Sequence, residues 1–471
     1  MTEDCSTVSH AVMQMKHFNT LPHKMKQLFV SSFGAFFDGS LRSPKRSASS
    51  TRSVRCPCAK RRRSGKAGGS ARILLHHRSG RTPRIPSRGY PVPTGDDPWM
   101  EVFEMELDEI QTPAIVADLA MMEHNMRKYQ NYADQGGCAL RPHIKTHKIP
   151  RLAQMQLDFG AKGITCAKLG EAEVMADSGI GDIFMAYPVI GPDKIRRFLD
   201  LSQTIRMICS VDSVEGASAL AAAARERGIT AEVRMEVDIG AHRTGVVMPR
   251  AVEMAKRIAG MPGLELSGIF GYKAMVLEGG PTLDPAAAGR EEGELLGETA
   301  QRIREAGIPL RDVSAGSTPT APYAAMAEGV NEIRPGTYIF QDAQRIVQGA
   351  ASPEECCGVM KVTVVSTPEK DRAVIDAGTK ALAGDSKLHA APMFLSSYGQ
   401  ILGRPDLRID RMNEEHGMIV CDGETGLHVG QPLYVIPNHI CTCINLFDRI
   451  YIREHDGSLT ETPVAARGRS V

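Results

Sequence analysis

From Thr112 onwards, short apolar segments alternate with longer amphipathic segments, the first typical of β-strands and the second of α-helices. Such alternation predicts parallel β-α-β units, because each helix returns the chain to the start of the next strand. About eight such units over roughly 200 residues predict an α/β fold of the TIM (β/α)8 barrel type. A doubly wound open sheet is the alternative, but no G-x-G-x-x-G motif opens a helix after the first strand.

The barrel is expected over residues 112–345. Its predicted strands are 139–145, 163–168, 182–187, 204–211, 231–238, 264–272, 311–316 and 332–340, and its predicted helices include 170–178, 214–227, 249–259 and 290–306. Before them, a strand at 115–117 leads into a helix at 119–134, for which Asp118 is the expected N-cap.

The pattern changes near residue 357. Segments 359–365, 372–375, 417–420 and 433–436 are β-like and are separated by Gly, Pro and Asp turns, with no convincing helix among them. We therefore expect a separate C-terminal β domain over residues 355–460.

The N-terminal stretch, residues 1–99, has a different composition from the rest. Residues 1–97 hold 18 Lys and Arg against five Asp and Glu, and they are rich in Ser, Gly and Pro. This composition predicts a disordered basic extension. A transit peptide and a nucleic-acid tail are alternatives. A wrongly assigned start codon, with the protein beginning near Met100 or Met105, is the interpretation we rank first, because every recognisable feature lies beyond it.

The remaining residues hold 38 Lys and Arg against 50 Asp and Glu, so the body of the protein is acidic and no nucleic-acid partner is expected for it. The 11 cysteines are irregularly spaced, which in a chain this long favours a reducing, cytoplasmic location over a disulfide framework. No apolar run of about 18 residues occurs, so no membrane span is predicted.

The motif R-P-H-I-K-T-H-K, at 141–148, follows the first predicted barrel strand. Burial beside other cations lowers the pKa of a lysine, so Lys145 is a candidate to form a Schiff base with an aldehyde. A solvated basic loop or a phosphate-binding patch is the ordinary alternative for such a cluster.

This motif resembles the cofactor-lysine motif of the D-threonine aldolase and D-serine dehydratase family, over about residues 111–453. Members of that family are fold-type III enzymes with an alanine-racemase-like barrel, and they use pyridoxal 5′-phosphate (PLP). The resemblance implies that Lys145 carries PLP, that the substrate is a small D-amino acid, and that the chain forms a homodimer.

Other candidate residues follow later strands, where a parallel barrel forms its active site. The resemblance implies that Arg243, in D-I-G-A-H-R-T-G, lies near the cofactor ring and its phenolic oxygen, and that Tyr272 lies beside the cofactor. The turn of Gly316, Ser317 and Thr318 can offer N–H groups and hydroxyls to a phosphate. Each has an ordinary alternative: a salt bridge from Arg243 to Asp238, a core aromatic, and a plain strand-to-helix turn.

A metal site is predicted at His439 and Cys441, two residues apart in the segment P-N-H-I-C after the strand at 433–436. In an extended segment these side chains face the same way, and an N/S pair suits Zn²⁺. A buried cysteine beside a hydrogen-bonded histidine is the alternative. The resemblance implies a divalent metal, Zn or Mn, and its dehydratase members use His and Cys here.

The chain departs from the family at Met275, where a histidine often stands three residues after the tyrosine and is the proposed base in aldolases. Methionine cannot accept a proton, so Lys273, His242, His143, His147 or metal-bound water would have to replace it. The resemblance implies a PLP-dependent lyase acting on D-β-hydroxy amino acids, first by retro-aldol cleavage. A metal- and PLP-dependent D-serine or D-3-hydroxyaspartate dehydratase and an amino-acid racemase are the alternatives.

Overall fold

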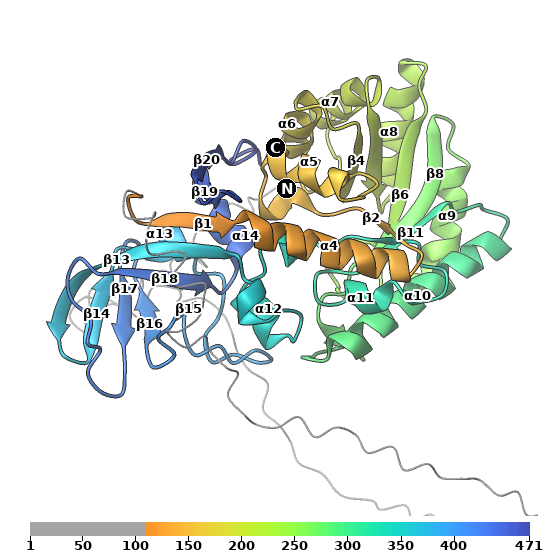
Figure 1. Cartoon of the computed structure of the whole chain (residues 1–471). Helices are drawn as coiled ribbons and strands as arrows, with labels where there is room; N and C mark the ends of the chain where they lie inside the picture. Colours follow the sequence, from red (N-terminus) through yellow and green to blue (C-terminus); the bar gives the residue numbers. More distant parts are fainter. Residues whose placement is uncertain (1–109) are drawn as a thin grey trace, which may run out of the picture. The chain divides into compact units, whose positions relative to one another are not determined.

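The computed structural model describes residues 110–471 (Figure 1). The basic extension predicted at 1–99 lies outside the described residues. None of the helices in the described part is long and apolar enough to cross a lipid bilayer.

Eight parallel strands form the barrel in the order β2-β12-β11-β8-β6-β5-β4-β3. They are β2 (Ala139–Leu140), β3 (Ile164–Cys166), β4 (Asp182–Pro188), β5 (Arg206–Val211), β6 (Ala231–Asp238), β8 (Leu264–Gly271), β11 (Asp312–Ala315) and β12 (Glu332–Ile333). The two ends of this order also meet, since the Lys162 N–H donates to the Leu140 carbonyl at 2.9 Å and His143 bridges Thr165. The TIM-type barrel is therefore confirmed, and the open sheet is excluded.

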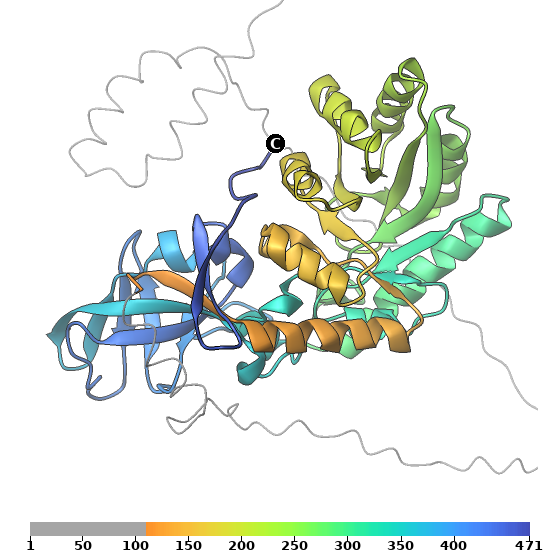
Figure 2. The same ribbon diagram turned by 45° about the horizontal axis from the view of Figure 1, so that its top comes forward.

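Helices cover the outside of these strands (Figure 1, Figure 2). They are α5 (Pro150–Asp158), α6 (Leu169–Asp177), α7 (Pro192–Ser202), α8 (Val214–Glu226), α9 (Ala251–Ala259), α10 (Pro285–Glu305) and α11 (Ala321–Ala324). N-cap side chains fix where two of these helices begin, because Ser213 and Asp284 accept N–H groups from the first turns of α8 and α10. Three further short strands accompany the barrel. The strand β7 (Val246–Val247) pairs with β6, and β9 (Val276–Leu277) forms a small hairpin with β10 (Gly280–Pro281).

The first and last barrel strands are shorter than predicted: the strands predicted at 139–145 and 332–340 form only at 139–140 and 332–333, and the assignments are wrong beyond those residues. The chain instead forms two 3₁₀ turns, η2 (Ile144–Thr146) and η4 (Thr337–Ile339). Pro142 and Pro335 explain the difference, because proline has no N–H to donate to a neighbouring strand. Lys145 consequently stands in a 3₁₀ turn beyond the strand end.

The strand β1 (Ala114–Asp118) belongs to the other sheet. It pairs antiparallel with β13 (Gly358–Glu369) and parallel with β19 (Arg449–Arg453). The helix α4 (Leu119–Gln135) then leads to the barrel, and Asp118 accepts the Met121 N–H at 2.9 Å, so the predicted N-cap is confirmed (Figure 1).

The C-terminal β domain contains the predicted strands. Its remaining strands are β14 (Arg372–Ile375), β15 (Gly399–Ile401), β16 (Arg408–Met412), β17 (Gly417–Val420), β18 (Pro432–Pro437) and β20 (Leu459–Pro463). It also contains the short helices α13 (Thr379–Leu382) and α14 (Ile440–Ile444), so the prediction of no helix is wrong. Helices of four or five residues are too short to show a 3.6-residue period.

The barrel and the β domain share one hydrophobic core, which includes Tyr338 and Phe340 near the end of the barrel and Ile440 and Ile444 of α14. Short segments of the chain join them, namely α12 (Ala343–Val347) and η5 (Pro353–Glu355). As a result, α14 lies against η2, the turn that holds Lys145.

Candidate active site

The predicted site residues of the barrel all lie just beyond the carboxyl ends of strands. Lys145 follows β2, Arg243 follows β6, Tyr272 follows β8, and the Gly316–Thr318 turn follows β11. In a parallel barrel these ends meet on one rim, which is where such folds carry their active sites.

Lys145 is exposed to solvent, yet enough protein surrounds it that burial is the largest influence on its pKa. Burial lowers this pKa, the neighbouring Cys441 opposes the effect, and the Arg243 guanidinium adds to it. The net direction is downward. A larger fraction of the Lys145 amine is therefore neutral and nucleophilic than in a free lysine.

His143 stands beside Lys145, and its Nδ1 accepts the Lys145 backbone N–H at 3.5 Å. Burial, followed by the charges of Lys145 and Arg334, holds the pKa of His143 well below its ordinary value. The imidazole is therefore neutral at physiological pH, and because Nδ1 accepts the Lys145 N–H, Nε2 carries the ring proton.

The Gly316–Thr318 turn depends on glycine at its first position. Gly316 has φ +81°, and a Cβ there would meet the Ala321 Cα at 2.8 Å. The buried Thr318 hydroxyl accepts the N–H groups of Gly336 and Tyr338, at 3.2 and 3.1 Å. Thr318 thus joins the turn after β11 to the turn after β12.

The turn after β12 in turn reaches the lysine segment. A Cβ on Gly336 would meet the His143 carbonyl oxygen at 3.1 Å and the Thr146 hydroxyl at 3.2 Å. Only a residue without a side chain lets the two backbones approach this closely. The turn after β12 therefore contacts the Gly316–Thr318 turn on one side and the Lys145 segment on the other.

Arg243 lies over the Tyr272 ring, with its guanidinium carbon 5.0 Å from the ring centre. The predicted alternative, a salt bridge to Asp238, is not what forms: Asp238 binds His242, and the nearest carboxylate to Arg243 is Glu236 at 3.9 Å. The guanidinium, which is about 59% exposed, is therefore free to contact a ligand at the rim.

The sequence places Arg334 at the eighth strand, where an isolated arginine is usually a surface charge, and assigns it no role. Its guanidinium donates to the Gly271 carbonyl at 2.8 Å and to the Ser314 hydroxyl at 2.5 Å. Burial lowers the pKa of Arg334 to about 10, against the opposing charge of Glu332. The positive charge of Arg334 also lowers the pKa of Lys145.

Glu292 of α10 is a second residue that the sequence did not single out. This fully buried carboxyl accepts the Gly316 N–H at 3.1 Å, and the Thr320 hydroxyl and the Lys273 N–H bind it as well. It therefore fixes the turn after β11 and the end of β8 to the same group, and burial raises its pKa.

His439 and Cys441 do come together, but not as an extended pair. His439 is the N-cap of α14 and Cys441 lies in its first turn, so the extended geometry predicted for them is wrong. The Asp342 carboxylate supports this bend, because it accepts the Ile440 N–H of the first turn of α14 at 3.3 Å.

The electrostatics of this pair are coupled. Burial alone would lower the pKa of His439, but hydrogen bonds with Asp385 and Cys441 outweigh it and raise the pKa to about 10. Burial would raise the pKa of Cys441, but the hydrogen bond and charge of His439 lower it. The sulfur also lies 3.2 Å from the Thr146 hydroxyl, next to Lys145.

Four candidates for the missing base can now be separated. His147 is fully buried and bound to Gln156, and burial lowers its pKa to about 4. His242 is about 80% exposed and bound to Asp238. Lys273 is buried and paired with Glu291. His143 is the candidate that lies beside Lys145. Met275 itself is buried, as expected for an apolar side chain.

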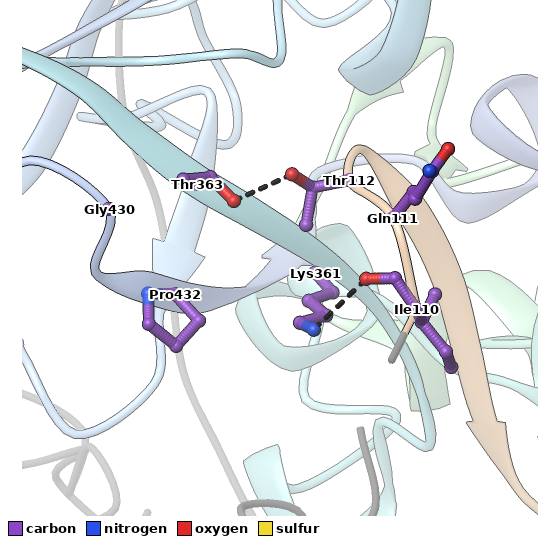
Figure 3. A pocket seen from close by; sticks show the side chains of 7 residues that line it. All are labelled: Ile110, Gln111, Thr112, Lys361, Thr363, Gly430 and Pro432. Carbon is purple, nitrogen blue, oxygen red and sulfur yellow. Dashed lines mark hydrogen bonds between the residues drawn. The ribbon is translucent and has the colours of Figure 1, made fainter. Parts of the chain in front are cut away.

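A pocket of about 440 Å³ lies elsewhere, on the β domain (Figure 3). Its lining includes Thr112 and Thr363, whose hydroxyls lie 2.6 Å apart, and Lys361, which donates to the Ile110 carbonyl. None of the predicted site residues belongs to it.

The residues present suit the two groups that the resemblance implies. For PLP, the chain offers an amine with a lowered pKa, a glycine turn into which no Cβ fits, and two guanidinium groups. For a divalent metal, it offers one imidazole and one thiol of lowered pKa. Within residues 110–471 no group of three or more His, Cys, Asp or Glu could hold a metal ion, so this is a two-donor arrangement.

Comparison with known proteins gives a consistent result. Residues 117–344 match the family described as alanine racemase, N-terminal domain, and residues 359–453 match the putative serine dehydratase domain. The D-threonine aldolase of Arthrobacter sp. is 31% identical over 77% of this chain and 94% of its own length. The D-threo-3-hydroxyaspartate dehydratase of Delftia sp. (strain HT23) is 32% identical over 74% and 96%.

Solved structures agree. The dehydratase from Delftia sp. HT23 superposes with a TM-score of 0.69 at 31% identity, over 75% of this chain and 97% of that one. The D-threonine aldolase from Filomicrobium marinum does so with a TM-score of 0.69 at 28% identity, over 76% and 96%. These matches confirm the resemblance: the chain belongs to the fold-type III family of PLP-dependent lyases that includes D-threonine aldolases and D-serine dehydratase-like enzymes.

Proposed function

We propose that this protein cleaves a D-configured β-hydroxy amino acid by a retro-aldol reaction, giving glycine and an aldehyde. The observation that carries the proposal is the position of Lys145, an amine of lowered pKa on the rim that also holds Arg243, Tyr272 and the Gly316–Thr318 turn. When bound, PLP supplies an aldehyde for the lysine and a ring that withdraws electrons from the substrate's α-carbon.

The chain's own residues would hold and orient that cofactor. We assign Lys145 Nζ to its aldehyde carbon, the Gly316 and Ser317 end of the turn to its phosphate, and Arg243 to its phenolic oxygen. Tyr272 would lie beside the ring, held in place by the guanidinium above it. Thr318 has its hydroxyl engaged by two N–H groups, so its contribution is to hold the phosphate turn against the lysine segment.

Retro-aldol cleavage also requires a group that takes the proton of the β-hydroxyl. We assign this role to His143, whose neutral ring would take the proton at Nδ1, the nitrogen with the lone pair, on releasing its 3.5 Å contact with the Lys145 N–H. His439 and Cys441 would hold a divalent metal, Zn or Mn, which supplies a Lewis acid at the same rim. The hydrogen-bond distance between Cys441 and Thr146 supports a metal close to Lys145.

Dehydration is the second candidate, and two observations favour it. Met275 replaces the family's base histidine and is buried, and the metal pair contains sulfur, as in the dehydratase members. In that reaction Lys145 would take the α-proton and the substrate hydroxyl would leave, giving a keto acid and ammonia.

Product analysis tests the proposal. The enzyme, supplied with PLP and Zn²⁺ or Mn²⁺, is incubated with D-threonine and D-serine, with Lys145→Ala as the control. Glycine and acetaldehyde from D-threonine support cleavage, whereas a keto acid from either substrate with no glycine overturns it in favour of dehydration. Exchange of the α-hydrogen of D- and L-alanine in heavy water, without lyase products, would instead indicate a racemase.

We also propose that the enzyme is a homodimer in a reducing, cytoplasmic location. The eight cysteines of the described part of the chain are all free, which supports the location. Light scattering of the purified protein and imaging of a tagged chain test the two statements.

A further inference from the structure

Asp385 stands next to the proposed metal pair. Its Oδ2 accepts a hydrogen bond from His439 Nδ1 at 2.6 Å, and its Oδ1 accepts one from the Thr442 hydroxyl at 3.1 Å. The residue lies 54 positions before His439, in the loop that follows α13, and nothing in the sequence pattern connects the two.

This contact determines which histidine nitrogen is available. A carboxylate can only accept hydrogen bonds, so Nδ1 must carry the proton, and Nε2 is the nitrogen left with a lone pair when the ring is neutral. Histidine ligands of metals commonly donate their second N–H in this way, which fixes the tautomer and the ring orientation and makes the free nitrogen more basic.

The carboxylate is itself held in place. The next residue, Ser386, is buried, and its hydroxyl accepts a hydrogen bond from the Gln344 side-chain amide of α12 at 2.9 Å. Together with the Thr442 contact, this anchors Asp385 and the residue that follows it. Asp385 therefore approaches His439 from a fixed position, although about 42% of its side chain is exposed.

The second donor is held from the opposite side. Cys441 Sγ lies 3.2 Å from the Thr146 hydroxyl and 3.4 Å from the Thr337 hydroxyl, both on barrel turns. The β domain thus orients the imidazole while the barrel positions the sulfur. A two-donor arrangement needs such support, because it cannot rely on a third protein ligand to hold its geometry.

We propose that Asp385 is a positioning residue that orients His439 Nε2 toward the divalent metal held with Cys441. This rests on the metal site of the proposed function. Asp385 acts through His439: its Oδ2 is engaged with the ring, so it need not contact the metal or the substrate.

The experiment measures metal affinity directly. PLP-loaded enzyme is stripped with a chelator, and the zinc dissociation constant is obtained by competition with a chromophoric chelator for the wild type, Asp385→Ala and Asp385→Asn. We expect Asp385→Ala to bind zinc about 10- to 100-fold more weakly. Asp385→Asn should lose less, because its amide oxygen can still accept the Nδ1 proton. The absorbance of bound PLP at about 420 nm should be unchanged in all three, which shows that each is folded and loaded.

A matched control is Glu123→Gln. Glu123 also accepts a bond from a histidine, His455, at 3.0 Å on the surface, and this change should leave the zinc dissociation constant at the wild-type value. Cobalt substitution adds a second readout: Asp385→Ala saturated with cobalt should keep the thiolate-to-cobalt absorption of the wild type, since Cys441 still binds.

Three results would overturn the inference, and they are distinguishable. A wild type that binds zinc, with Asp385→Ala within twofold of it, removes Asp385 from the site and leaves the proposed metal in place. A wild type that binds no zinc removes the metal itself, and with it the role of Asp385. A changed cobalt spectrum in saturated Asp385→Ala would make Asp385 a direct ligand and also contradict the positioning role.

Discussion

The barrel contains two clusters of charge, and they differ in how their cations are paired. A floor cluster consists of Arg141, Asp182, Arg234, Asp312 and Glu332, of which Asp182, Asp312 and Glu332 are the first residues of β4, β11 and β12. Glu332 binds Arg141 at 2.9 Å and Arg234 at 2.5 Å, Asp182 binds Arg141 at 2.5 Å, and Asp312 binds Arg234 at 3.0 Å. Every guanidinium there faces two carboxylates, although both arginines are fully buried.

At the carboxyl ends lies a mouth cluster of His143, Lys145, Arg243 and Arg334, and it lacks such pairing. The nearest carboxylate to Arg243 is 3.9 Å away, and Arg334 donates to a carbonyl and a hydroxyl. Burial, and after it neighbouring cations, lowers the pKa values of His143 and Lys145.

The short segment after β2 carries one residue of each cluster. Arg141 and Lys145 are four residues apart, yet the first has its charge fully compensated and the second has its charge disfavoured. Removing one partner of a compensated buried pair leaves an unpaired charge and destabilises the fold, whereas an uncompensated cluster favours a neutral amine and attracts anions such as a phosphate. We therefore expect mouth variants to lose function and floor variants to lose stability.

Lys145→Ala should give the largest effect and should affect activity alone. Removing the amine removes the group to which the cofactor aldehyde is assigned, so we expect kcat/KM to fall by at least about 10³-fold. The midpoint of thermal unfolding of the cofactor-free protein should stay the same or rise, because an amine that burial disfavours has been removed. Enzyme assays and calorimetry measure the two quantities; retained activity would contradict the assignment.

Glu332→Ala should produce the opposite pattern at the floor. It leaves two buried guanidinium groups without their shared carboxylate, which typically destabilises a protein by about 3–5 kcal/mol. Urea unfolding of the cofactor-free protein measures the loss. A variant that unfolds at the wild-type urea concentration would show that the floor cluster is not needed for stability.

We also expect the stability of the fold to depend on acid pH through Glu232. This carboxylate binds Arg206, which in turn binds Asp182 of the floor cluster. Burial alone would raise the pKa of Glu232, but hydrogen bonds from Arg206 and Ser267 outweigh it and lower the pKa to about 2. Because the folded-state pKa is depressed, the stabilisation is present above the unfolded value of 4.5 and is lost as the pH falls toward 2. Glu232→Gln should therefore be less stable by about 2 kcal/mol at pH 7, with the difference vanishing near the folded pKa. A difference that persists unchanged at low pH would contradict this origin.

The comparison also shows what could be predicted from sequence. The alternating strands and helices, the Asp118 cap and the motif around Lys145 are local patterns, and the structure contains each of them. The floor cluster is not local: its five members come from five separate strands or turns, and a charged residue within a strand does not reveal its partner. The pairing of Asp385 with His439 and the bend at Cys441 depend equally on contacts across the fold.

The smallest effect is predicted for the affinity for PLP when Arg243 of the mouth cluster is changed. Arg243→Lys keeps the positive charge but loses the planar guanidinium over the Tyr272 ring, a contact that is worth about 0.5–1 kcal/mol at an exposed site. We expect the dissociation constant of PLP to rise about two- to fivefold, as measured by titration of the cofactor-free enzyme, with the absorbance of the bound form unchanged. Tyr272→Leu, which removes the ring and keeps Arg243, should give a similar or larger change. If Arg243→Lys leaves PLP affinity at the wild-type value while Tyr272→Leu weakens it, then charge alone matters at position 243. The mouth cluster would then act on the cofactor through its electrostatic field rather than through this stacked pair.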